Sequence, residues 1–133
     1  MRKIEHLGIA VKDIHKANET FSKLLGKASY KQETVESESV TTSFFEIGES
    51  KIELLQATDE SSAIHKFLTK NREGIHHIAF DVADINSEIS RLKKEGFIFI
   101  TDIPKKGADN KLVVFIHPKS ANGILVELCQ EIA

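Results

Sequence analysis

The chain has 133 residues, which suits one domain of ordinary size that can fold without a disulfide or metal staple. Its 18 Lys and Arg against 20 Asp and Glu give a net charge of −2, which argues against nucleic-acid and membrane-surface binders. A single cysteine, Cys129, excludes an internal disulfide, and no apolar run is long enough to span a membrane.

The first half of the chain predicts a strand, a helix and three further strands. The alternating stretch KIEHLGIAV is typical of a strand. Asp13 then provides the N-cap of a helix with apolar residues at helical spacing, and Gly26 ends that helix. The three further strands are expected over residues 29–35, 39–47 and 51–57.

The second half predicts the same order after a short helix and loop over residues 59–73. The stretch IHHIAFDV is typical of a strand, and Asp84 caps a helix that Gly96 ends. The remaining strands are expected over residues 97–101, 111–116 and 124–130.

Two stretches of the chain recur in the same order. HLGIAVKDI, from His6, matches HIAFDVADI, from His77, and KIELLQ, from Lys51, matches LVELCQ, from Leu125. Two such matches indicate a duplicated module. We therefore predict an α+β fold in one domain, residues 1–133, with two tandem βαβββ modules. Module 1 covers about residues 1–58, a linker helix about 59–73, and module 2 about 74–133.

The strand period separates the side chains that pack on the helices from those that do not. Successive strand residues point to opposite faces, so the large aliphatic residues of each first strand face the helices. The other face carries a histidine beside small residues, and each module's last strand carries a glutamate on that face. His76 has the aliphatic parity and lies at the start of the strand, so we expect it to pack there or to fray. The four residues on the open faces are His6, Glu53, His77 and Glu127.

These four residues form a candidate metal site. A lone strand histidine is more often a hydrogen-bonded structural residue, but that reading does not explain why both residue types recur at equivalent positions. If the two curved mixed sheets form one cleft, the four groups line it. Two imidazoles and two carboxylates suit Co²⁺, Mn²⁺, Ni²⁺ or Zn²⁺.

Several motifs resemble a known family over essentially the whole chain. HLGIAVKDI, EGIHHIAFDVADI and FIHPKSANGILVEL are similar to the vicinal oxygen chelate superfamily and, within it, to the methylmalonyl-CoA epimerase family. The resemblance implies a single divalent ion, with Co²⁺ favoured, and a homodimer. It places the metal ligands at the same four positions, although some relatives have glutamine at position 53.

The resemblance also implies the chemistry. The carbon of methylmalonyl-CoA between thioester and carboxylate would lose its proton and regain it on the other face, with Glu127 as the first acid/base candidate. The second acid/base stays open. Thr42 stands where some family members have glutamate, and Glu46 shares its face as a weaker candidate.

Coenzyme A is anionic, and basic residues cluster in the last third of the chain. Lys111 and Lys119 are candidate phosphate contacts, and His117 is a candidate for shaping the substrate site, although a solvated basic loop explains the lysines equally well. Because the N-terminus lacks the apolar region of a signal peptide, we expect a cytoplasmic protein, or an organelle-matrix one if a transit peptide has been removed.

Two alternative functions share the predicted fold. A glyoxalase I-like lyase acting on glutathione hemithioacetals would use the same four ligands, so the metal site does not exclude it. The HPKS turn and the lack of tryptophan argue against that lyase. A metal-free small-molecule-binding protein is less favoured, because all four metal-competent residues are present.

Overall fold

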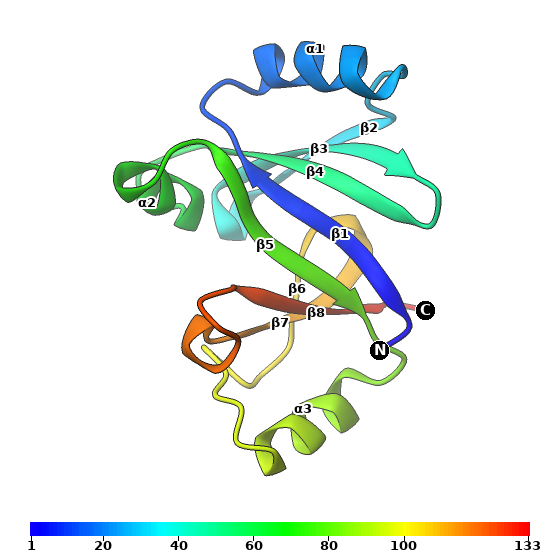
Figure 1. Cartoon of the computed structure of the whole chain (residues 1–133), viewed down its shortest axis with the longest axis vertical. Coiled ribbons are helices and arrows are strands. Elements are labelled where there is room, and N and C mark those ends of the chain that lie inside the picture. Colours follow the sequence, from blue (N-terminus) through cyan, green and yellow to red (C-terminus); the bar gives the residue numbers. More distant parts are fainter. The chain divides into compact units, whose positions relative to one another are not determined.

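The computed structural model describes all residues, 1–133, and forms a mixed α+β fold (Figure 1). The eight strands and three α-helices are, in chain order, β1 (Lys3–Ala10), α1 (Ile14–Leu25), β2 (Lys31–Val35), β3 (Val40–Ile47), β4 (Ser50–Ala57), α2 (Ala63–Lys70), β5 (Gly74–Asp81), α3 (Ile85–Lys94), β6 (Lys105–Lys106), β7 (Lys111–Ile116) and β8 (Val126–Glu131). The predicted order βαβββ therefore occurs twice, with the predicted linker helix between the copies. None of the helices is long and apolar enough to cross a membrane.

Both long module helices begin at the predicted caps. The Asp13 carboxylate accepts hydrogen bonds from the backbone N–H groups of His15 and Lys16 at the start of α1. The Asp84 carboxylate accepts one from the N–H of Ser87 at the start of α3. Gly26 ends α1 in the left-handed conformation, with φ 72°, which glycine adopts at no steric cost.

The compact units of the structure do not coincide with the two sequence modules. One unit comprises Met1–His6 with His77–Ala133, and the other comprises Leu7–His76. Strands β1 and β5 each contribute residues to both units. The two candidate ligand histidines, His6 and His77, consequently belong to the same unit, although they come from different sequence modules.

The unit Leu7–His76 is built on the antiparallel strands β2, β3 and β4. Ile14 and other apolar residues of α1 pack with Phe45 and Leu54. Ile64 of α2 packs with Leu55. Because Leu54 and Leu55 are successive strand residues, the two helices cover opposite faces of this sheet.

The unit of Met1–His6 and His77–Ala133 contains β5 paired in parallel with β8, followed by the antiparallel strands β7 and β6. The apolar stripe of α3 packs on β7 and β8. Its core members are Val82, Ile85, Ile89, Leu92, Val114, Ile116, Val126 and Leu128. Glu127 lies between two of these residues in β8, so its side chain points to the face opposite α3.

The strand registers support the duplication. Phe44 of β3 lies opposite Glu53 of β4, and Phe115 of β7 lies opposite Glu127 of β8. The last residue of each repeated stretch also has the same contact. The Gln56 Oε1 atom accepts the N–H of Ile14 at 2.7 Å, and the equivalent Gln130 Oε1 accepts the N–H of Ile85 at 2.8 Å.

The prediction of a strand over residues 97–101 is wrong. Only Phe99 pairs, in a single bridge to Ile116, whereas Ile98 and Ile100 are more than half exposed. The alternating apolar residues have the pattern of a strand, but regular pairing does not extend beyond Phe99. The Ile98 N–H donates to the Ser120 hydroxyl rather than to the backbone of a neighbouring strand. The short strand β6 follows instead.

Candidate metal centre

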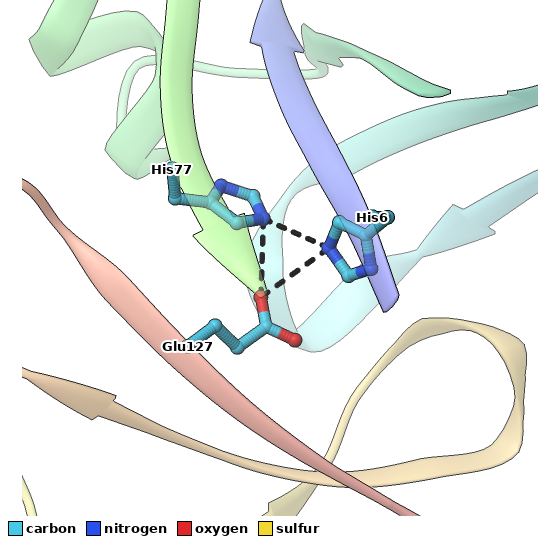
Figure 2. Close-up of side chains that lie close together, drawn as sticks. All are labelled: His6, His77 and Glu127. Carbon is cyan, nitrogen blue, oxygen red and sulfur yellow. Dashed lines mark hydrogen bonds and ion pairs between the residues drawn. The ribbon is translucent and has the colours of Figure 1, made fainter. Parts of the chain in front are cut away.

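Three of the four predicted ligands lie together in one unit, and they come from β1, β5 and β8 (Figure 2). The Nε2 atoms of His6 and His77 are 3.0 Å apart. The Glu127 Oε1 atom is 3.1 Å from the His77 Nε2 atom and 3.7 Å from the His6 Nε2 atom. All three side chains are buried, so the three donor atoms converge on one point inside the protein.

Strand geometry explains how His77 and Glu127 meet. Ala79 lies opposite Glu127 in the parallel pairing of β5 with β8, and His77 is two residues before Ala79 on the same face. The small alanine side chain leaves room above the sheet. Phe115, opposite Glu127 on β7, contacts the His77 ring edge-on with 5.8 Å between centroids. The Phe115 ring therefore restricts rotation of the His77 imidazole.

The charge state of Glu127 follows from two opposing influences. Burial raises the pKa of its carboxyl group, but the adjacent imidazoles of His6 and His77 lower this pKa by more than burial raises it. The net result is a pKa well below the ordinary value. Glu127 is consequently ionised, which is the form that binds a metal or accepts a proton.

The second oxygen of Glu127 has its own partner. The Cys129 thiol, which is fully buried, donates to the Glu127 Oε2 atom at 2.8 Å. The two residues share one face of β8, two positions apart. The carboxylate thus directs Oε1 toward the imidazoles and Oε2 toward the thiol. Sequence reasoning assigned no role to this cysteine.

The three donor atoms suit a first-row divalent ion. Such ions bind imidazole nitrogen and carboxylate oxygen at about 2.0–2.2 Å, which separates neighbouring donor atoms by about 3.0–3.4 Å. The observed separations of 3.0, 3.1 and 3.7 Å are close to that range. The residues present therefore fit a metal, and two nitrogens with one oxygen are compatible with Co²⁺, Ni²⁺ or Zn²⁺.

The fourth predicted ligand, Glu53, belongs to the other compact unit. It lies in β4, opposite Phe44, and its side chain is buried. Burial of a carboxylate in a strand is uncommon unless the group has partners or binds an ion. Its role as a ligand to the same metal stays a prediction.

His76 and His77 have the separate positions that strand parity predicts. The His76 ring contacts Phe67 of α2 edge-on at 5.0 Å between centroids. It lies in the unit Leu7–His76, whereas His77 lies in the unit that contains Glu127. The adjacent histidines therefore do not form one feature.

Lys111 lies in an environment that sequence reasoning did not foresee. Its side chain is buried, and its ammonium nitrogen is 4.0 Å from Glu5 Oε2 and 3.7 Å from Glu131 Oε1. Glu5 in turn contacts the His6 ring. The only sequence signal was a glutamate at an aliphatic position of the first strand, next to a candidate ligand. The predicted contact of Lys111 with a coenzyme A phosphate stays a prediction.

The other two predicted substrate residues lie in a turn after β7. His117 caps the one-turn 3₁₀ helix Pro118–Ser120, where its Nδ1 atom accepts the N–H of Lys119 at 3.1 Å. The backbone N–H of His117 donates to the carbonyl of Ile98. Lys119 is exposed. The structure thus gives His117 a turn-forming contact and leaves the Lys119 ammonium accessible to an anion.

The positions considered for a second acid/base differ in burial. Thr42 is 1% exposed, and its hydroxyl has no hydrogen-bond partner in the structure. Glu46 is exposed near the end of β3. Thr42 pairs with Leu55, two residue pairs away from Phe44 and Glu53 on the same face of the sheet.

The chain matches known proteins over most of its length. Residues 5–115 match the family model described as "Glyoxalase/Bleomycin resistance protein/Dioxygenase superfamily". The chain is 40% identical over 130 residues to the ethylmalonyl-CoA/methylmalonyl-CoA epimerase of Cereibacter sphaeroides, covering 96% of this chain and 97% of that protein. It is 39% identical over 127 residues to the mitochondrial methylmalonyl-CoA epimerase of Dictyostelium discoideum, covering 95% and 76%.

A solved structure has the same fold. It is a variant of the Streptomyces coelicolor methylmalonyl-CoA epimerase in complex with 2-nitronate-propionyl-CoA, and it matches with a TM-score of 0.94 and 33% identity. The match covers 100% of this chain and 96% of that chain.

Proposed function

Because the chain belongs to the Glyoxalase/Bleomycin resistance protein/Dioxygenase superfamily and, within it, to the methylmalonyl-CoA epimerase family, we propose that it interconverts (R)- and (S)-methylmalonyl-CoA. The observation that carries this proposal is the convergence of His6, His77 and Glu127 at 3.0–3.7 Å inside one unit. An epimerase must remove and return an acidic α-proton, and this cluster offers a metal site with an ionised carboxylate.

The proposed cofactor is one divalent metal ion, held by His6, His77 and Glu127 and, as a predicted fourth ligand, Glu53. The resemblance favours Co²⁺, and the donor set also suits Ni²⁺, Zn²⁺ or Mn²⁺. A metal bound here supplies Lewis-acid stabilisation for negative charge that develops on a substrate oxygen. The two histidines bind a metal as neutral imidazoles, so the carboxylates alone contribute negative charge to the ligand set.

Glu127 is proposed as one proton-transfer group. Its lowered pKa keeps it ionised at neutral pH, and the thiol of Cys129 fixes the direction of its second oxygen. Inversion requires a second proton-transfer group on the opposite face of the planar intermediate. Thr42 occupies the family position, but a hydroxyl is a poor general base, and Glu46 is the weaker candidate that remains.

The substrate is expected to bind through its coenzyme A phosphates as well as its acyl group. Lys119 is proposed as a phosphate contact, with Lys111 and His117 as further substrate-binding candidates. A homodimer and a cytoplasmic or organelle-matrix location complete the proposal, and both are expectations from the resemblance and the sequence.

The test follows the α-proton directly. The purified protein is loaded with Co²⁺ or treated with a chelator, supplied with methylmalonyl-CoA in D₂O, and the α-carbon is monitored for deuterium by mass spectrometry. We expect exchange that requires the metal. Absence of metal-dependent exchange, together with conversion of the methylglyoxal–glutathione hemithioacetal, would replace the epimerase proposal by the glyoxalase I-like alternative.

A further inference from the structure

The two ring nitrogens of His6 have different neighbours. Its Nδ1 atom is 2.9 Å from Glu5 Oε1, and its Nε2 atom is 3.0 Å from His77 Nε2. The side chains of His6 and Glu5 are 5% and 2% exposed, so water does not compete for these contacts. The ring is thus held between a carboxylate and the candidate metal centre.

The contact with Glu5 determines where the imidazole carries its hydrogen. An ionised carboxylate only accepts hydrogen bonds, so the His6 Nδ1 atom must donate. In the neutral ring the Nε2 atom then carries no hydrogen and keeps its lone pair as an acceptor. That lone pair points toward His77 and Glu127, which is the tautomer needed for metal binding through Nε2. The opposite tautomer would present a hydrogen to the metal centre.

A buried carboxylate needs compensation, and Lys111 supplies it. Glu5 uses Oε1 for His6 and has Oε2 at 4.0 Å from the Lys111 ammonium nitrogen. Lys111 is itself buried and reaches Glu131, whose side chain is 75% exposed, at 3.7 Å. A buried ion pair of this kind usually adds little net stability. Its presence beside a ligand histidine is better explained by a role in orienting that histidine.

We propose that Glu5, with its charge held by Lys111, is a positioning residue that fixes the ligating tautomer of His6. The proposal rests on the metal site of the proposed function and adds a residue pair outside the ligand set. Only in the first sequence module does a carboxylate directly precede the candidate ligand histidine. The residue before His77 is His76, whose ring packs on Phe67.

The tautomer can be read in the metal-free protein. Long-range ¹H–¹⁵N correlation spectra of protein labelled with ¹⁵N-histidine distinguish the two tautomers, and His6→Ala assigns the His6 signals. In the wild-type protein we expect the His6 hydrogen on Nδ1. In Glu5→Leu no acceptor remains for the Nδ1 hydrogen, so we expect the preference for that tautomer to be lost and the hydrogen to move toward Nε2.

Two further variants keep the test decisive. If Glu5→Leu does not fold because Lys111 lacks a buried partner, the double variant Glu5→Leu, Lys111→Met removes both charges. Glu131→Gln alters only the exposed end of the network and is the matched control. We expect the double variant to change the tautomer and Glu131→Gln to leave it unchanged.

Metal affinity gives the second readout. Changes in a partner outside the ligand set typically weaken metal binding by about 10–100-fold. We expect a loss of that size in Co²⁺ titrations of the Glu5 variants and wild-type affinity in Glu131→Gln. An unchanged His6 tautomer in the Glu5 variants overturns this proposal. A wild-type protein that binds no metal overturns the metal site itself, so the two failures are distinguishable.

Discussion

The two βαβββ copies share the contacts that position their strands and helices, but they differ in the residues next to the candidate ligands. In both copies a phenylalanine lies opposite the candidate ligand glutamate, and a glutamine caps the module helix. The residue before the histidine differs, because Glu5 contacts the His6 ring whereas His76 packs on Phe67. The duplication thus sets where the candidate ligands stand, while the residues that surround each ligand are specific to one copy.

The largest expected effect separates the neighbouring histidines. His77→Ala removes one of three converging donors, so we expect Co²⁺ binding to weaken far more than the roughly 10–100-fold typical of changes outside the ligand set. His76→Ala loses only an aromatic contact with Phe67, worth about 0.5–1.5 kcal/mol of stability. Titration calorimetry with Co²⁺ measures both. Equal loss of affinity in the two variants would contradict the assignment of the ligand.

The equivalent glutamates of the two copies provide the next comparison. Glu127→Gln removes a proposed proton-transfer group, so we expect α-proton exchange to fall by about 10²–10⁴-fold. Glu53→Gln keeps an oxygen ligand at a position where some relatives have glutamine, so we expect a much smaller loss. Deuterium incorporation into methylmalonyl-CoA, measured at saturating metal, compares them. A larger loss in Glu53→Gln than in Glu127→Gln would assign the proton transfer to the first copy.

The equivalent glutamines should contribute equally to folding. Gln56→Ala and Gln130→Ala each leave the N–H group at the start of a module helix without its acceptor. We expect each to lower the free energy of unfolding by about 1–2 kcal/mol. Urea unfolding followed by circular dichroism tests this. If only one variant is less stable, the two caps are not equivalent despite their shared geometry.

The sequence predicts the order of elements because the information is local. Asp13 and Asp84 initiate helices through contacts with residues two and three positions later, and strand alternation is visible in single stretches. The segment 97–101 shows the limit of that reasoning. Its alternating apolar residues predict a strand, but strand pairing depends on residues far away in the sequence, and pairing here amounts to one bridge, from Phe99 to Ile116.

The candidate site was predictable only in part. The repeat and the strand parity together selected His6, His77 and Glu127, which the structure brings together. Glu5 and Lys111 could not be predicted as a pair, because they are far apart in sequence and because both residue types are rarely buried. The repeated glutamines were visible in the sequence, but nothing local indicates that their side chains reach a helix start.

The smallest expected effect concerns a buried hydroxyl that only the first copy contains. Thr42 pairs with Leu55 as Val113 pairs with Cys129 in the second copy, so threonine stands where the equivalent position has valine. The Thr42 hydroxyl is buried and has no hydrogen-bond partner. Since an unsatisfied buried hydroxyl is costly, we expect Thr42→Val to raise the free energy of unfolding by about 0.5–1 kcal/mol.

The neighbouring Ser43 is the matched control for that variant. Its hydroxyl is also buried, but it forms hydrogen bonds with the side chains of Asn18 and Ser29. We expect Ser43→Ala to lower the free energy of unfolding by about 1 kcal/mol, opposite in sign to Thr42→Val. Urea unfolding of the metal-free protein measures both variants. A less stable Thr42→Val protein would mean that the hydroxyl has a stabilising partner in solution, and the first copy would then need its threonine for folding.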